Sequence, residues 1–279
     1  MAFDGYYTRM GHAEYEQGGE DFNDDTYFPF QDVEDVLNFR PAQRYTMNFS
    51  SALQAVNDDY DRQNKFYPNC VNVSGCYISA LSGLLEIFGW EMLLLAVGES
   101  EQRFAEVISD YRKFILPYFE VLAASKAPVI MIHDDLCWTS GMIFYKEFYE
   151  KYLIPLLKEE TQILREKGKK VLFTSDGDYT ALIDDIAGCG VNGFVLEPCT
   201  ALKYVTEKYG KTHVIIGNAD TRLLLSGSRE DIEAEVRRCI GLGKNCPGYC
   251  MAVGNHIPSN TPPENAVYYN EIYEKLSKR

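Results

Sequence analysis

Short apolar segments alternate with helical stretches along most of the chain. The apolar segments are rich in β-branched residues, which is typical of buried strands. In the stretch between two of them, Phe104, Val107, Ile108 and Tyr111 recur at helical spacing. Such alternation predicts a parallel sheet with crossover helices. The six predicted strands are residues 70–73, 128–132, 170–174, 193–196, 213–216 and 249–253.

Local signals mark several helix ends. Ser228 with Asp231 three residues later predicts an N-cap. Thr261 followed by two prolines and Glu264 predicts a capping box at the start of the last helix. Pro155 is expected to kink or interrupt its helix. The predicted helices are residues 32–39, 49–63, 100–124, 146–167, 180–189 and 228–242, and one that begins near residue 261.

The first part of the chain differs from the rest in pattern. Residues 1–65 are acidic and aromatic, and they predict an irregular N-terminal arm with short helices. Residues 66–279 form the predicted single barrel domain. Because a full barrel has eight strands, either the arm contains a strand near residues 26–31 or the barrel lacks its first one or two strands. An incomplete barrel exposes strand edges that must be covered, so a homo-oligomer is an open alternative.

A polar residue follows almost every apolar segment. Polar strand ends line the mouth of a β/α barrel, the face at the carboxyl ends of its strands, where active sites of that fold lie. A doubly wound sheet would instead gather its polar strand ends at one switch point. Such a sheet would also be expected to carry a Gly-x-Gly-x-x-Gly or phosphate-loop motif, and neither is present. The pattern predicts an α/β fold, a TIM-type barrel. The candidate site residues are His133, Asp134, Asp135, Ser175, Asp176, Asp178, Glu197, Asn218, Asp220, Asn255 and His256.

Each candidate also has a structural interpretation. The carboxylates after residue 133 could cap the next helix, but two adjacent acids, Asp134 and Asp135, exceed what a cap needs. Asp176 precedes a glycine, as in an ordinary turn. Glu197 could pair with a neighbouring cation, and asparagine is a common turn residue. His256 lies at the end of the last strand, where a structural and a functional histidine are both expected.

Charge and composition exclude several functions. The net charge of −14 disfavours nucleic acid, whose binding requires a basic surface. No basic amphipathic stretch, long apolar run or signal-peptide pattern is visible, so no membrane partner is expected. The eight cysteines form no Cys-x-x-Cys pair, which favours reduced structural thiols. The composition predicts a cytoplasmic protein.

From about Tyr77 onward the chain resembles the uroporphyrinogen decarboxylase superfamily, which includes corrinoid-linked methyltransferases. The order and spacing of several segments carry the resemblance, and together they are far more specific than any one alone. The family fold is a β/α barrel with its site at the carboxyl-terminal mouth. The matching segments are residues 85–91, 133–135, 173–178, 217–220, 254–258 and 261–265.

The chain departs from the methyltransferases at their zinc site. Those enzymes hold zinc by His-x-Cys at one strand end and by a cysteine on the last strand. The matching positions here are Phe173, Ser175 and Asn255, and phenylalanine cannot bind a metal. No metal ligand is therefore assigned, and no tightly bound cofactor is expected. An oxygen-rich or mixed metal site remains an alternative, drawn from Asp134, Asp135, Asp176, Glu197 and His256.

The chain also departs from the decarboxylases. Their substrate carries many carboxylates, and an N-terminal arginine segment that binds it has no match here. The last-strand histidine of the decarboxylases falls at Asn255, with His256 one place along. An acidic mouth would repel a polyanion.

The resemblance therefore implies methyl transfer between a small methylated substrate and a corrinoid-binding protein or similar acceptor. Porphyrinogen decarboxylation and a non-catalytic binding relative are the alternatives. The predicted catalytic residues are Asp134, Asp176, Glu197 and His256. The predicted substrate-binding residues are His133, Asp135, Ser175, Asp178, Asn218, Asp220 and Asn255.

Overall fold

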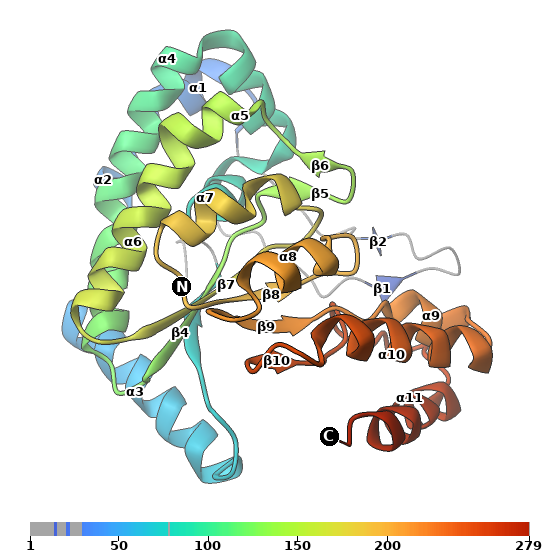
Figure 1. Cartoon of the computed structure of the whole chain (residues 1–279). Coiled ribbons are helices and arrows are strands. Elements are labelled where there is room, and N and C mark those ends of the chain that lie inside the picture. Colours follow the sequence, from blue (N-terminus) through green and yellow to red (C-terminus); the bar gives the residue numbers. More distant parts are fainter. Residues whose placement is uncertain (1–13, 16–20, 23–29, 78, 279) are drawn as a thin grey trace.

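The structure is a computed structural model that describes residues 14–15, 21–22, 30–77 and 79–278. Its centre is a six-stranded parallel sheet in the order β10-β9-β8-β7-β4-β3 (Figure 1). The strands are β3 (Ser74–Cys76), β4 (Val129–His133), β7 (Lys170–Thr174), β8 (Gly193–Leu196), β9 (Val214–Gly217) and β10 (Tyr249–Cys250). The predicted parallel α/β fold is confirmed.

Among the described residues, the sheet is not closed by hydrogen bonds between its two edge strands, β3 and β10. Strand order follows chain order from β3 to β10, as in a β/α barrel in which consecutive strands are neighbours. Two short antiparallel pairs lie outside this sheet: β1 (Glu14–Tyr15) with β2 (Asp21–Phe22), and β5 (Cys137–Trp138) with β6 (Gly141–Met142). Of the strand predicted near 26–31, residues 26–29 lie outside the described residues.

The first strand of the sheet was predicted in the wrong place. Residues 70–73 precede β3, and Val71 is 79% exposed. The actual strand, Ser74–Cys76, lacks a β-branched residue. At Gly75 a Cβ atom would collide with the carbonyl oxygen of Met131 on β4. The close approach of β3 to β4, and not a bulky side chain, therefore explains why this segment is a strand.

A long helix, α4 (Leu81–Ala124), packs beside the sheet. It contains a kink at Gly89, where φ is +74°, and a second break at Ser100, where φ is −158° and ψ is 91°. Its second half was predicted from helical spacing, but its first half was missed. The first half is apolar, and its residues 81–89 are all buried, which removes the polar face that reveals a surface helix. By length and composition, α4 is the one helix among the described residues that could cross a membrane, yet 67% of its apolar window is buried inside the fold, as in a core helix.

The helix predicted at 146–167 consists of three parts. A short α5 (Lys146–Phe148) continues into a π-helical turn (Tyr149–Leu153) and then α6 (Ile154–Glu166), which packs against α4 (Figure 1). Pro155 is the second residue of α6 and directly follows the π-helical turn. The change of helical pitch therefore precedes the proline.

The remaining helices surround the sheet. The capping box at Ser228 and Asp231 is confirmed at the start of α10. The capping box predicted at Thr261 is wrong: Pro262 occupies the N-cap position, and the buried Thr261 hydroxyl has no hydrogen-bond partner among the described residues. The α-helices that follow β7 in the chain are α7 (Ile183–Gly188), α8 (Leu202–Tyr209), α9 (Thr221–Ser226), α10 (Arg229–Gly243) and α11 (Pro263–Leu276).

The described part of the N-terminal arm packs on α4. It contains α1 (Val33–Asn38), α2 (Pro41–Arg44) and α3 (Phe49–Phe66), each in contact with that helix. Phe30 and Phe39 meet Phe88 of α4 edge to face, with ring centroids 5.1 and 5.7 Å away. The arm is thus joined to the body through an aromatic contact near the kink in α4.

Candidate functional site

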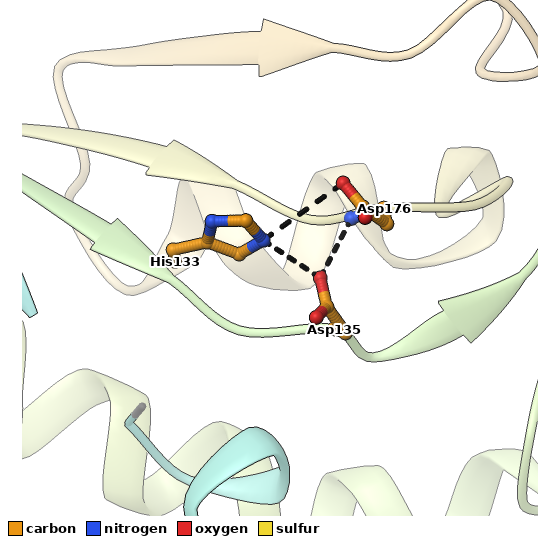
Figure 2. Close-up of side chains that lie close together, drawn as sticks. All are labelled: His133, Asp135 and Asp176. Carbon is orange, nitrogen blue, oxygen red and sulfur yellow. Dashed lines mark hydrogen bonds and ion pairs between the residues drawn. The ribbon is translucent and has the colours of Figure 1, made fainter. Parts of the chain in front are cut away.

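Two adjacent strand ends bring three polar side chains together. His133 is the last residue of β4, and it pairs in register with Thr174 at the end of β7. This pairing places Asp176, two residues beyond β7, beside the β4 end. The Nε2 atom of His133 lies 2.8 Å from Oδ1 of Asp135 and 3.8 Å from Oδ1 of Asp176. Figure 2 shows the imidazole directed at both carboxylates. We call His133, Asp135 and Asp176 the histidine–aspartate cluster.

The cluster is buried at its base and open at its outer side. The side chains of His133 and Asp135 are 9% and 15% exposed, whereas that of Asp176 is 51% exposed. Asp135 Oδ1 also accepts a hydrogen bond from the Asp176 backbone N–H at 3.0 Å. The two strand ends are therefore joined by the carboxylate of Asp135.

Charge interactions inside the cluster shift its ionisation. Burial lowers the pKa of His133, but the hydrogen bond and charge of Asp135 outweigh it, so the pKa is raised. Burial raises the pKa of Asp135, but the hydrogen bond and charge of His133 outweigh it, so the pKa is lowered. Tyr77, whose ring centroid is 4.1 Å from that of His133, has its pKa raised to about 12 by burial and by the charges of Asp176 and Asp135.

Asp134 points the other way and supports the fold. Its two carboxylate oxygens accept hydrogen bonds from the backbone N–H groups of Ala80, Leu81 and Ser82 at the start of α4. The side chain is almost completely buried, and burial raises its pKa to about 6. Asp134 therefore caps a helix, but that helix is α4, which precedes it in the chain, and not the next helix as expected from the sequence. The geometry gives a catalytic role for Asp134 no support.

Glu197 lies at the end of β8 and connects the cluster to the last strand. Its Oε2 accepts a hydrogen bond from the Gly177 N–H at 2.9 Å, and its Oε1 accepts one from the Asn255 side-chain amide at 2.6 Å. A continuous path thus runs along the mouth from β4 to the segment after β10. We call it the strand-end path; its residues are His133, Asp135, Asp176, Gly177, Glu197 and Asn255.

The loop that carries Asp176 is held by the rest of residues 175–178. The buried Ser175 hydroxyl accepts a hydrogen bond from Leu136 N–H and donates one to the Asp176 carbonyl. Gly177 has φ +80°, and a Cβ there would collide with the backbone of the β5 segment. Asp178 accepts hydrogen bonds from the backbone N–H and the hydroxyl of Thr180. Ser175 and Asp178 therefore shape the loop.

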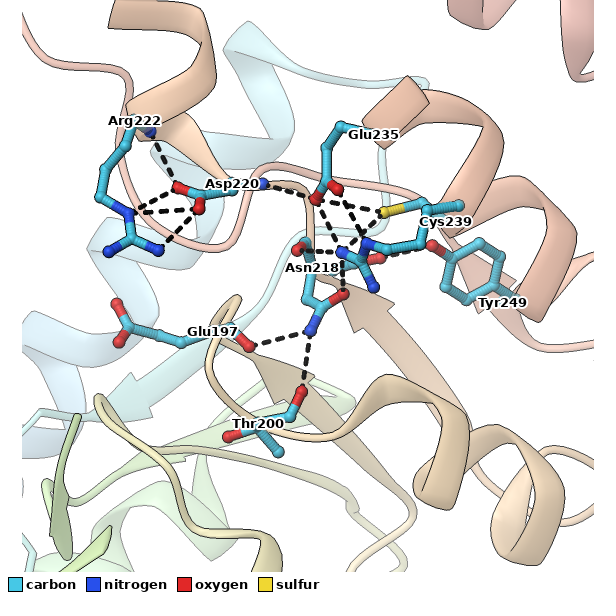
Figure 3. A network of polar contacts seen from close by, with 10 residues as sticks. Glu197, Thr200, Asn218, Asp220, Arg222, Glu235, Cys239 and Tyr249 are labelled. Carbon is cyan, nitrogen blue, oxygen red and sulfur yellow. Dashed lines mark hydrogen bonds and ion pairs between the residues drawn. The ribbon is translucent and has the colours of Figure 1, made fainter. Parts of the chain in front are cut away.

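Asn218 lies below the mouth in a network of polar contacts. Figure 3 shows its amide directed at the backbone of Glu197 and Thr200, to whose carbonyls it donates at 2.9 Å. Arg238 of α10 donates to both oxygens of Asn218 and pairs with Glu235 at 2.7 Å. Asn218 is fully buried, so it positions the Glu197 backbone from beneath.

Asp220 and His256 lie at the edge of the mouth. Asp220 caps α9 and pairs with Arg222 at 2.7 Å, and this contact lowers its pKa against the effect of burial. His256 is exposed, and its Nδ1 lies 2.9 Å from the side-chain oxygen of Asn255. Substrate-binding or catalytic roles for these residues stay predictions.

Three aromatic residues near the site were missed by the sequence analysis. Tyr77 follows β3 directly, and a correctly placed strand would have identified it as a strand-end residue. Trp90 of α4 and Trp138 of β5 are both about half exposed, with ring centroids 5.3 Å apart. The Trp138 carbonyl accepts a hydrogen bond from the Asp178 N–H at 2.8 Å, so this pair lies against the loop of Asp176.

The residues at the family's thiolate–zinc positions do not fit that metal. Phe173 is fully buried and packs against Tyr179. The Ser175 hydroxyl is engaged within its loop, and the Asn255 amide donates to Glu197. The His/Cys/Asp/Glu group among the described residues that could hold a cation is instead the histidine–aspartate cluster, whose three donor atoms lie within 4.8 Å of one another.

The chain is similar to two classes of enzyme. It is 26% identical over 203 residues to uroporphyrinogen decarboxylase of Syntrophotalea carbinolica, covering 73% of this chain and 57% of that protein. It is 27% identical over 153 residues to methylcobamide:CoM methyltransferase MtbA of Methanosarcina mazei, covering 54% and 43% respectively. The chain therefore spans about half the length of the curated relatives it matches.

A solved structure and a family model agree with these relatives. A methyltransferase from Methanosarcina mazei superposes with a TM-score of 0.64 at 18% identity, covering 95% of this chain and 76% of the other, which shows a shared fold. The family model for uroporphyrinogen decarboxylase (URO-D) matches residues 29–275. This match includes the sheet, α4 and all the strand-end residues described above, and the chain therefore belongs to the uroporphyrinogen decarboxylase family.

Proposed function

We propose that this protein transfers a methyl group between a small methylated substrate and a corrinoid carrier or similar acceptor. The observation that carries the proposal is the strand-end path, which lines one mouth with carboxylates from three neighbouring strands. Active sites of β/α barrels lie at this face. The MtbA relatives and the solved methyltransferase support this branch of the family.

Asp176 and Glu197 are the residues that we assign to the reacting substrate. They flank the turn at Gly177, and the Asp176 side chain is half exposed. In the reaction the bond between the methyl carbon and a heteroatom breaks, and the heteroatom must be held while the methyl group leaves. A carboxyl group within hydrogen-bond reach can orient that heteroatom and exchange a proton with it.

Among the described residues, two arginines near the mouth already have partners, which favours a small substrate over a polycarboxylate. Arg222 is paired with Asp220, and Arg238 is paired with Glu235. Each arginine thus carries its own counter-ion, and a ligand with many carboxylates would have to displace it. The carboxylates of the strand-end path would also repel such a ligand.

The test uses Asp176→Asn and Glu197→Gln in the full chain, with Glu207→Gln on exposed α8 as the matched control. Methyl transfer from a panel of methylated amines, ethers and thioethers to free cobalamin is followed by absorbance. We expect each site variant to lose about 10²- to 10⁴-fold in rate and the control to retain the wild-type rate. Unchanged rates in both site variants, or no turnover of any donor by the wild-type protein, would contradict the proposal.

Porphyrinogen decarboxylation is the second candidate. It is favoured by the length of the matches: the decarboxylase of Syntrophotalea carbinolica matches 203 residues of this chain, whereas the MtbA relative matches 153 residues. This candidate predicts tight binding of a polycarboxylate, which a fluorescence titration with coproporphyrin would detect. Tight binding that depends on Arg222 would support decarboxylation over methyl transfer. A non-catalytic binding relative would turn over none of the methylated donors.

A further inference from the structure

We propose that the histidine–aspartate cluster binds one divalent transition-metal ion, through Nε2 of His133 and one carboxylate oxygen each from Asp135 and Asp176. The site differs in position and chemistry from a thiolate–zinc centre, since it uses one imidazole and two carboxylates. Binding of the ion does not depend on methyl transfer, so this inference stands apart from the proposed function.

The distances between donor atoms match a shared cation. Ligands about 2.1 Å from an octahedral ion lie about 3.0 Å apart when adjacent and about 4.2 Å apart when opposite. Here Nε2 of His133 is 2.8 Å from the Asp135 oxygen and 3.8 Å from the Asp176 oxygen. All three donor atoms fall within 4.8 Å of one another. Small side-chain movements would therefore be enough to bring them around one ion.

The base of the site is built before any ion binds. The His133 side chain is nine-tenths buried, its ring lies against that of Tyr77, and its Nε2 is directed at both carboxylates (Figure 2). Asp135 is fixed by the Asp176 N–H. Asp176 is half exposed, so three protein ligands would occupy one side of the ion and leave positions facing solvent, as in open metal sites.

The negative charge of the site also favours the binding of a cation. Asp135 is mostly buried, yet among the described residues its side chain contacts no lysine or arginine. Its one charged partner is His133, which is itself a metal ligand when neutral. A divalent ion would balance the charge of Asp135.

The donor set selects the class of ion. Calcium takes oxygen ligands alone and in larger number, so an imidazole nitrogen disfavours it. One imidazole with two carboxylates suits Mn²⁺, Fe²⁺ or Zn²⁺, which accept mixed nitrogen and oxygen ligands. Mn²⁺ is the most useful probe, because its electron spin resonance signal measures the free ion and gives the bound fraction by difference.

The experiment titrates chelator-treated full-length protein with Mn²⁺ and compares Asp176→Asn with Asp178→Asn. Asp178 is the matched control, because it lies in the same loop and its hydrogen bonds to Thr180 survive as asparagine. We expect one Mn²⁺ per wild-type chain and per control chain, competition by Zn²⁺ but not Ca²⁺, and affinity at least about tenfold weaker in Asp176→Asn. Unfolding curves check that each variant folds.

Two results would overturn the inference: no Mn²⁺ or Zn²⁺ binding to the wild-type protein at about 1 mM, or equal affinities in Asp176→Asn and the control. His133→Gln provides a second variant if Asp176→Asn does not fold, and it too must weaken binding. Methyl transfer that persists after chelation would leave the proposed function intact while metal binding is judged by the titration alone.

Discussion

Asp134 and Asp135 are neighbours in the sequence, yet the structure gives them opposite surroundings. Asp135 faces the mouth and contacts His133, whereas Asp134 faces inward and accepts hydrogen bonds from three backbone N–H groups. Alternate residues of an extended segment point to opposite sides, and this geometry separates the two acids. A pair of adjacent carboxylates therefore provided one residue for the site and one for the start of α4.

Another buried acid, Glu160 on α6, has no role in the mouth. Neither of its carboxyl oxygens has a hydrogen-bond partner among the described residues, and the side chain is fully buried. Burial raises its pKa well above the ordinary value, with a smaller contribution from Asp134. The folded state therefore favours the neutral acid.

This raised pKa predicts a pH-dependent stability. The folded protein holds the Glu160 proton more tightly than the unfolded chain, so the stability from this group is complete below pH 4.5, its ordinary pKa, and declines as the pH rises toward the folded value. Glu160→Gln should reduce this decline and be more stable than the wild type at pH 8. Urea unfolding between pH 4 and pH 8 measures it. Glu166→Gln, an exposed site on the same helix, should leave the decline unchanged; a decline identical in Glu160→Gln would refute the assignment.

At the scale of elements, the sequence predicted features that depend on neighbouring residues in the chain. It did not predict features that depend on contacts between distant segments. The capping box of α10 depends on two residues three apart, so sequence alone identified it. The start of α4 depends on Asp134, more than fifty residues away, and no local signal marks it. The position of β3 depends on how closely Gly75 approaches β4. In both cases the deciding contact is tertiary.

The kink in α4 gives a prediction for this element. Gly89 has φ +74°, which L-residues rarely adopt, whereas Gly98 precedes the second break in α4, at Ser100, and has open space where a Cβ would lie. Gly89→Ala should therefore destabilise the protein by about 1–3 kcal/mol. Gly98→Ala should stabilise it by about 0.4–1 kcal/mol, because alanine gives the unfolded chain less conformational freedom than glycine. Chemical denaturation measures both changes, and the same sign for both variants would contradict the described kink.

At the scale of the whole molecule, the sequence could predict which residues belong to the candidate site but not how they lie relative to one another. His133, Asp135 and Asp176 were each identified from their positions after apolar strands. Their convergence depends on β4 lying next to β7, which joins segments about forty residues apart. The buried positioning role of Asn218 depends on Arg238 from a distant helix. Tyr77 escaped notice because its strand was misplaced.

The order of strands predicts where the molecule opens first. β7 and β8 are hydrogen-bonded to strands on both sides, whereas β10 is a two-residue edge strand. Backbone amides of β7 and β8 should exchange with solvent slowest, at a free energy near that of global unfolding, and those of β10 much faster. Native-state hydrogen exchange by mass spectrometry measures this order. Equal protection of β10 and β7 would show that the β10 edge is covered in solution.

The contact between Trp90 and Trp138 gives the protein a built-in optical reporter. These are the two tryptophans of the chain, so all indole emission comes from one place. Trp138 belongs to the hairpin that touches the loop of Asp176, and Trp90 follows the kink in α4. Any ligand that moves this loop relative to the helix changes the separation of the two rings. Occupancy of the mouth can thus be followed by fluorescence without attaching a dye.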